Sequence, residues 1–235
     1  MNLTIVRLTA RALMGGKRVW LLVALGLVLV GIAVVTRIFV SDDTSTVGLQ
    51  TVAFGTFLPL FGLIVGTGVI GPEIDDGSIV HLLSKPLSRH TIVQSKLAVA
   101  VLAIVGFAVV PTVLAAVILR APASAVLAFG VGALCAGAVY SVVFGLLAIL
   151  TRHAVIVGLV YALVWESLVG SIVPGARNVS VQQWALSVTS SIAPDGMVTA
   201  HVGLAVSWGL IVGVLVAATW YAGRRLQVFV LKGDD

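Results

Sequence analysis

The stretch WLLVALGLVLVGIAVVTRIFV, from Trp20 to Val40, decides the class of fold because it is long and apolar enough to cross a membrane as one helix. Such a helix needs about 20 apolar residues to span about 30 Å of hydrocarbon. A secretory signal has a shorter apolar core, of about 7 to 15 residues, followed by a small-residue cleavage site. No such site follows here before Asp42. We therefore predict a retained transmembrane helix.

The same apolar composition extends over the whole chain. Of the 235 residues, 60% are hydrophobic and 10% are charged, and the mean hydropathy is +1.17. Soluble domains contain about 25% charged and about 45 to 50% apolar residues. The single cysteine, Cys135, excludes an intrachain disulfide. We predict an all-α fold with one transmembrane permease domain over residues 1–235.

Six apolar stretches are long enough to cross, which predicts a multi-pass protein with six transmembrane helices. They cover Trp20–Val40, Thr51–Ile70, Leu97–Leu119, Ala125–Leu150, Ala154–Ile172 and Leu204–Tyr221. Of the 14 lysines and arginines, eleven fall before the first span, between spans two and three, between spans four and five, or after the sixth. This bias predicts the inner (cytoplasmic) membrane with both termini in the cytoplasm. Because the cations are spread between the spans, nucleic acid is not expected as a partner.

A polar loop, GPEIDDGSIVHLLSKPLSRHTIVQSK from Gly71 to Lys96, joins spans two and three. Its centre predicts a short amphipathic helix on the cytoplasmic side. Carboxylates at its start favour the helix dipole, and Pro86 ends it. The apolar face would hold Ile79, Leu82 and Leu83, and the polar face Ser78, His81, Ser84 and Lys85.

This loop and the six-span layout resemble the type-2 ATP-binding-cassette (ABC) exporter permeases. The matching positions are Glu73, Gly77, Leu82, Leu83, Ser84, Pro86, Ser88, Arg89 and Lys96. The resemblance implies a coupling helix that docks on a separate ABC ATPase, with two ATPase subunits beneath two permease chains, as a homodimer or with a close paralogue. The implied coupling residues are Glu73, Asp75, Asp76, Gly77, Ile79, His81, Leu82, Leu83, Ser84, Lys85, Pro86, Ser88 and Arg89. A second interpretation, in which the loop helix packs on lipid headgroups, remains open.

The sequence contains no motif that would make this chain an enzyme. It has no G-x-x-x-x-G-K-[ST] loop to hold phosphates, so ATP and Mg²⁺ are expected only on the partner ATPase. The four histidines are scattered and form no metal-binding pattern with cysteine. We predict no cofactor and no metal on this chain.

The first 18 residues predict a basic amphipathic helix in the membrane interface, with its cations near anionic membrane lipid. In the resembled family this element is an elbow helix beside the ATPase. Its basic residues are Arg7, Arg11, Lys17 and Arg18, and the apolar side holds Ile5, Val6, Ala12 and Leu13. A lipid anchor and an ATPase contact are compatible interpretations.

Two features inside the spans have open interpretations. Glu166, after Trp165 in span five, either lines a translocation path or makes an interhelical hydrogen bond, for example with Ser167 or Thr219. The pentapeptide GLIVG occurs twice, at Gly62–Gly66 and Gly209–Gly213. Small residues four apart allow close helix packing, within one bundle or between two subunits.

The predicted function is export of an amphipathic, lipid-like or drug-like substrate, because apolar spans compensate poorly for the desolvation of an ion. The substrate itself cannot be read from the sequence. In one alternative, the permease transmits force to an extracytoplasmic partner through residues 173–203, as in relatives that serve metalloenzyme maturation. In another, the chain is an ATP-independent channel or scaffold.

Overall fold

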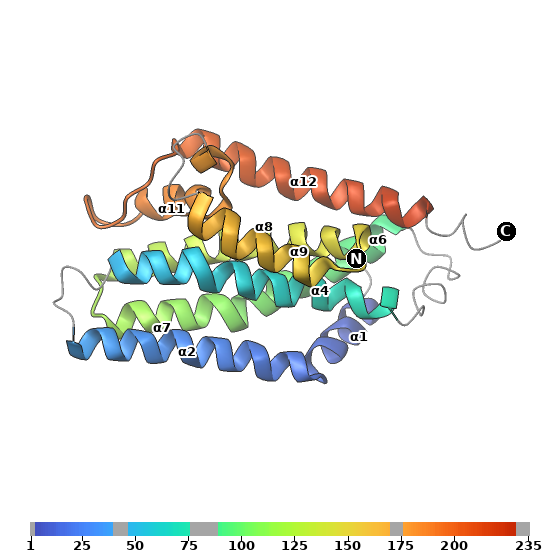
Figure 1. The fold of residues 1–235 in the computed structure, drawn as a ribbon, viewed down its shortest axis with the longest axis horizontal. Helices are drawn as coiled ribbons and strands as arrows, with labels where there is room; N and C mark the ends of the chain where they lie inside the picture. Colours follow the sequence, from blue (N-terminus) through green and yellow to red (C-terminus); the bar gives the residue numbers. More distant parts are fainter. Residues whose placement is uncertain (1–2, 40–46, 76–88, 170–175, 229–235) are drawn as a thin grey trace.

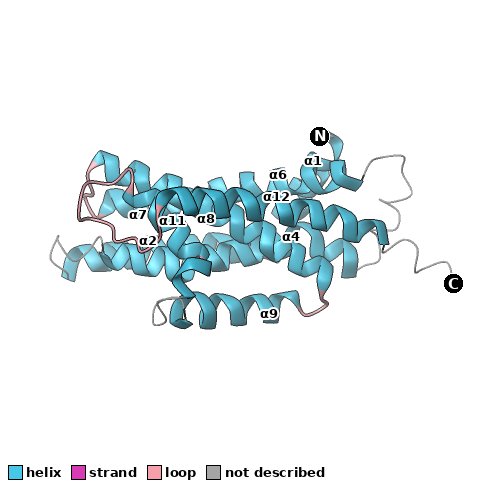
Figure 2. Ribbon diagram, turned by 90° about the horizontal axis from the view of Figure 1, so that it is seen from above, coloured by secondary structure: helices cyan, strands magenta, loops and turns pink. Residues whose placement is uncertain are grey.

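We describe the fold from a computed structural model, which covers residues 3–39, 47–75, 89–169 and 176–228. Within these ranges every regular element is a helix, and the long helices run side by side along one axis (Figures 1 and 2). The expected all-α fold is therefore confirmed for this part of the chain. The predicted coupling helix lies outside the described residues and stays a prediction.

The N-terminal part forms two helices, α1 (Leu3–Met14) and α2 (Lys17–Phe39). Glycine has a low helix propensity, and the pair Gly15 and Gly16 separates the two helices. Lys17 and Arg18, predicted on the basic N-terminal helix, belong instead to the first turn of α2. The elbow cations are therefore divided between two helices.

Among the residues that the structure describes, five helices are long and apolar enough to cross a membrane. They are α2; Val47–Val69, from η1 (Gln50–Phe57) and α4 (Leu58–Asp75); Ile92–Ile118, from α6 (Arg89–Ile104), η2 (Val105–Val109) and α7 (Val110–Ile118); α8 (Ala123–Leu150); and α12 (Leu204–Val228). Each overlaps one predicted span, which makes this a multi-pass membrane protein. The elements η1 and η2 are π-helical segments within longer helices.

The π-helical segment η2 has a local cause in Pro111. Proline donates no backbone hydrogen bond, and its ring crowds the carbonyl four residues earlier, here that of Phe107. A wider turn before the proline accommodates both effects. Gly26 on α2 packs against this π-helical segment and the proline. A side-chain carbon at Gly26 would lie 3.0 Å from the Pro111 ring and 3.8 Å from the Phe107 oxygen.

The predicted fifth span corresponds to a shorter helix. It consists of the 7 residues of α9 (Ala154–Val160) and the 9 of the π-helical segment η3 (Tyr161–Val169). At 1.5 Å per residue these cover about 24 Å, less than the hydrocarbon thickness. The path of the chain still requires this passage, because α8 ends at one end of the bundle and α12 begins at the other (Figure 1). Five spans are shown, and the sixth stays a prediction.

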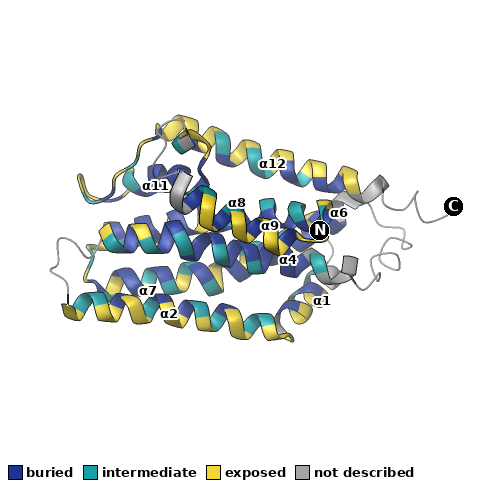
Figure 3. Cartoon of the chain, viewed as in Figure 1, coloured by how far each residue is buried: buried dark blue, intermediate teal, exposed yellow. Residues whose placement is uncertain are grey.

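The helices Val47–Val69 and α8 form the centre of the bundle (Figure 3). In an 18-residue apolar stretch of each helix, 72% of the residues are buried in Val47–Val69 and 61% in α8. The corresponding shares are 22% in α2 and 17% in α12. The outer helices α2 and α12 therefore expose apolar side chains, as surfaces facing lipid or a second chain do. After η3 come two short helices at one end of the bundle: α11 (Val181–Ser190), which packs against α8 and α12, and η4 (Ala176–Val179), which contacts α11.

Candidate functional site

The two ends of the predicted coupling loop lie at the same end of the bundle as α1 and the last turn of α12 (Figure 1). Glu73 and Asp75 belong to the last turn of α4, and Arg89 is the first residue of α6. The other predicted coupling residues, from Asp76 to Ser88, lie outside the described residues. The structure thus brings the two anchors of the loop together.

Lys96 connects these two anchors. Its side chain is only 3% exposed, and its Nζ donates a hydrogen bond of 3.0 Å to the backbone oxygen of Val69 on α4. A cation near the C-terminal end of a helix is also favoured by the helix dipole. Since Lys96 lies on α6, a displacement of the loop would act on α4 and α6 together.

We expect Lys96→Met to loosen this connection, because methionine keeps most of the side-chain volume but cannot donate to Val69. Hydrogen bonds to charged groups contribute about 1.5 to 3 kcal/mol, so the free energy of unfolding should fall by about 2 kcal/mol. Thermal unfolding of the purified permease in detergent measures this change. Lys17→Met removes an exposed lysine and serves as the control; equal stability of the two variants would contradict the role of Lys96.

Arg18 provides a second connection, between α2 and α4. Its Nη1 donates to the backbone oxygen of Gly68 at 3.2 Å. Gly68 leaves the required room, since a side-chain carbon there would lie 3.1 Å from Leu13 Cδ1 and 3.4 Å from Arg18 Nη1. Both α1 and the start of α2 therefore pack on the last turns of α4. The other elbow cations, Arg7, Arg11 and Lys17, are exposed.

At the opposite end of the bundle, Glu166 is completely buried in η3. Its carboxylate accepts hydrogen bonds from Tyr161 Oη at 3.0 Å and Ser180 Oγ at 2.5 Å. It also accepts from the backbone nitrogens of Val181 at 3.1 Å and Gln182 at 3.4 Å, in the first turn of α11. The dipole of α11 favours an anion at this N-terminal end of the helix. Glu166 thus fastens the short helix α11 to the fifth passage of the chain.

Sequence reasoning missed these partners. Thr219, suggested as a partner, donates to the Leu215 oxygen of its own helix. One signal was present, because Ser180 and Gln183 have the S-x-x-Q spacing of a capping box. Ser180 caps α11 by accepting from Gln183 N, whereas Gln183 Oε1 has no partner among the described residues. No local pattern would have connected this cap to Glu166.

The Nε1 atom of Trp165, next to this polar cluster, has no hydrogen-bond partner within the described ranges. The hydroxyl of Tyr140 lies close to Glu166 and to the backbone of Gln182. Buried polar groups are normally paired with protein or water. The prediction that Trp165 and Glu166 line a translocation path stays a prediction.

The two GLIVG copies have different surroundings. At Gly62 a side-chain carbon would overlap with Tyr140 Cβ, and at Gly66 with the backbone oxygen of Ser141, so α4 packs closely on α8. At Gly209 and Gly213 nothing described lies within 4 Å. The first copy packs inside the bundle, and the second lies on the outer face of α12.

The described residues include no group of three or more His, Cys, Asp or Glu that could hold a metal ion. The prediction that the chain binds no metal or cofactor is not tested by this observation. The buried charged side chains in the described part are Lys96 and Glu166, and each is engaged by another helix.

These features define a multi-pass helical membrane protein in which the elements flanking one polar loop are tied to the central spans. The family model described as ABC-2 family transporter protein matches residues 16–176, and the chain belongs to this family. The resemblance based on the polar loop is thereby confirmed. No curated protein matches the chain. The protein is a membrane component of an ABC transporter, and permeases of this family normally work with an ABC ATPase.

Proposed function

We propose that this chain is the permease subunit of an ABC exporter that moves an amphipathic, lipid-like or drug-like substrate out of the cytoplasm. A separate ATPase supplies the energy and holds the ATP and Mg²⁺. Within the family assignment, the observation that supports the proposal is the hydrogen bond from Lys96 to Val69. This bond connects α6 and α4, the two helices that flank the predicted coupling loop.

In the proposed mechanism two ATPase subunits bind beneath two permease chains in the inner membrane, with the termini and the loop on the cytoplasmic side. Closure of the ATPases on ATP pulls on the loop. The Lys96 and Arg18 connections then transmit this motion to α2, α4 and α6 as one unit. The exposed outer face of α12, with Gly209 and Gly213, is available for the second permease chain.

An amphipathic cargo is supported by the apolar character of the bundle. Lys96 and Glu166 are the buried charged side chains of the described part, and both already have hydrogen-bond partners. A small ion leaving water would find little compensation along such walls. A lipid-like molecule needs less compensation for leaving water, because its apolar part stays in contact with apolar side chains or lipid.

The packing of α11 favours export over force transmission to an external partner. That alternative needs residues 173–203 as a docking surface. Eight of the ten residues of α11 are buried, among them Trp184, and Glu166 holds its first turn. Most side chains of α11 therefore pack within the bundle and are not exposed to a partner.

We expect the double variant Leu82→Asp/Leu83→Asp to abolish stimulation of the ATPase by the permease. Two carboxylates on the apolar face of the predicted coupling helix would remove its apolar contact with the ATPase. The measurement is ATP hydrolysis by the complex in vesicles, together with membrane insertion of the variant. The control, Ser78→Asp, adds a carboxylate to the opposite face at a position outside the implied coupling residues and should hydrolyse ATP like the wild type.

Unchanged stimulation with Leu82→Asp/Leu83→Asp would overturn the assignment of the coupling face. A permease that never copurifies with an ABC ATPase would overturn the proposed exporter as a whole and favour a channel or scaffold.

A further inference from the structure

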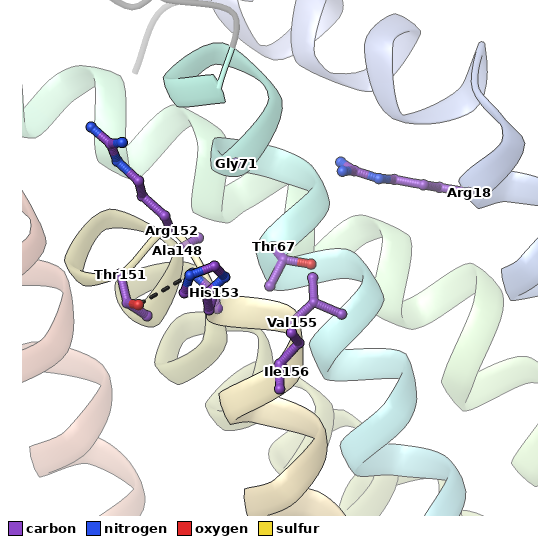
Figure 4. Close-up of a pocket in the computed structure, with 10 residues that line it drawn as sticks. Arg18, Thr67, Gly71, Ala148, Thr151, Arg152, His153, Val155 and Ile156 are labelled. Atoms are coloured by element: carbon purple, nitrogen blue, oxygen red, sulfur yellow. Dashed lines mark hydrogen bonds between the residues drawn. The ribbon is translucent and has the colours of Figure 1, made fainter.

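A cavity of about 230 Å³ opens beside the last turns of α4, at the end of the bundle that carries the coupling loop (Figure 4). Its walls come from the start of α2, from α4, and from the turn between α8 and α9 together with the beginning of α9. The polar cluster around Glu166 does not include any of its lining residues, and of these only Arg18 also takes part in the proposed coupling.

Basic side chains line the cavity from two sides, α2 and the turn between α8 and α9. Arg18 points toward Thr67 and Gly71, whereas the exposed Arg152 stands at the rim with its guanidinium directed away from Thr67 (Figure 4). Within the described residues, Arg18 donates one hydrogen bond, to Gly68, of the five that a guanidinium can make. His153 lies next to Arg152, and none of the lining residues that the structure describes is acidic. An anion is therefore the ligand that these side chains suit.

The turn that carries Arg152 and His153 has a defined shape. The backbone nitrogen of His153 donates to Thr151 Oγ1 at 3.2 Å, as drawn in Figure 4. Thr151 also closes α8, since its own nitrogen donates to the Leu147 oxygen at 3.0 Å. The two basic residues are thus presented by a short turn between two helices rather than by a long loop.

Another side of the cavity is apolar and continues onto the outer surface of the bundle. Val155 and Ile156 line the cavity and are 55% and 63% exposed. Further along the same helix, Leu159 and Val160 are exposed as well. A basic recess next to an exposed apolar helix at the end of a membrane bundle matches an amphiphile with an anionic head.

We propose that this cavity binds the phosphodiester headgroup of an anionic phospholipid, with the acyl chains lying along α9. Arginine suits phosphate because its planar guanidinium donates two parallel hydrogen bonds to phosphate oxygens. Basic pockets between transmembrane helices bind lipid headgroups in this way. A free phosphate offers the same oxygens but would leave the apolar wall unused. The inference requires a membrane protein and does not rest on the proposed export function.

Native mass spectrometry of the purified permease, in neutral detergent with equal phosphatidylglycerol and phosphatidylcholine, tests the proposal. We expect the wild type to retain phosphatidylglycerol roughly tenfold over phosphatidylcholine. The variant Arg152→Gln/His153→Gln should lose most of this preference; both side chains are exposed, so the fold should remain intact. The control Arg224→Gln removes an exposed cation that stacks on Trp220, outside the cavity, and should bind like the wild type.

Equal retention of the two lipids by the wild type would overturn the proposal, as would an unchanged preference in Arg152→Gln/His153→Gln. A separate arm adds millimolar inorganic phosphate without lipid. If phosphate alone binds in a manner that depends on Arg152 and His153, while the lipids show no preference, the cavity is a free-phosphate site and the lipid assignment is wrong.

Discussion

Replacing Gly66 by alanine is expected to destabilise the bundle strongly. The added methyl group would overlap with the backbone oxygen of Ser141 and lie 2.9 Å from the backbone nitrogen of Gly145. Backbone atoms of α8 cannot move aside as the end of a flexible side chain can, so the two central helices must separate. Overpacking of this kind costs about 1 to 3 kcal/mol, and we expect the upper part of that range.

Thermal unfolding of the purified permease measures this effect, as a melting temperature lowered by roughly 6 to 12 °C. The second GLIVG copy offers a matched control, because Gly213→Ala makes the same change at the same place in the pentapeptide, where nothing described lies within 4 Å. Equal melting of Gly66→Ala and the wild type would contradict the close packing of α4 on α8. Loss of the dimer in Gly213→Ala with an unchanged melting temperature would support a subunit contact at that glycine.

Removing the Glu166 carboxylate should have an effect of similar or larger size. Glu166→Ala leaves the hydroxyls of Tyr161 and Ser180 and the first backbone nitrogens of α11 without their acceptor. Each buried donor left unpaired costs about 1 to 3 kcal/mol, so a loss of at least about 3 kcal/mol is expected. Glu166→Gln keeps one acceptor oxygen and should be destabilised less.

The matched control is Asp195→Asn, which neutralises an exposed acid in the segment that follows α11 and should melt like the wild type. Ser180→Ala should lower the melting temperature in the same direction as Glu166→Ala, because it removes both the cap of α11 and a bond to the carboxylate. If Glu166→Gln melts normally but loses substrate-dependent ATP turnover, the carboxylate acts on the translocation path. Wild-type melting of Glu166→Ala would contradict its role in holding α11.

The class of protein and most of its helices could be predicted from the sequence. The length of an apolar run is a local property, and it alone decides whether a helix can cross a membrane. The five long helices accordingly overlap the predicted spans. The loop motif from Gly71 to Lys96 was also local, and the family match over residues 16–176 agrees with it.

The sequence by itself determined that this chain is helical, crosses the membrane several times and resembles the ABC-2 permeases, because run length, composition and a contiguous motif are properties of neighbouring residues. Tertiary structure alone decided which GLIVG copy packs on α8, that Lys96 donates a hydrogen bond to α4, and that Glu166 accepts hydrogen bonds from the first turn of α11. These contacts join helices that are distant in the chain. The two identical pentapeptides show why: the same five residues pack closely in one place and lie open in the other, because only the surrounding helices differ.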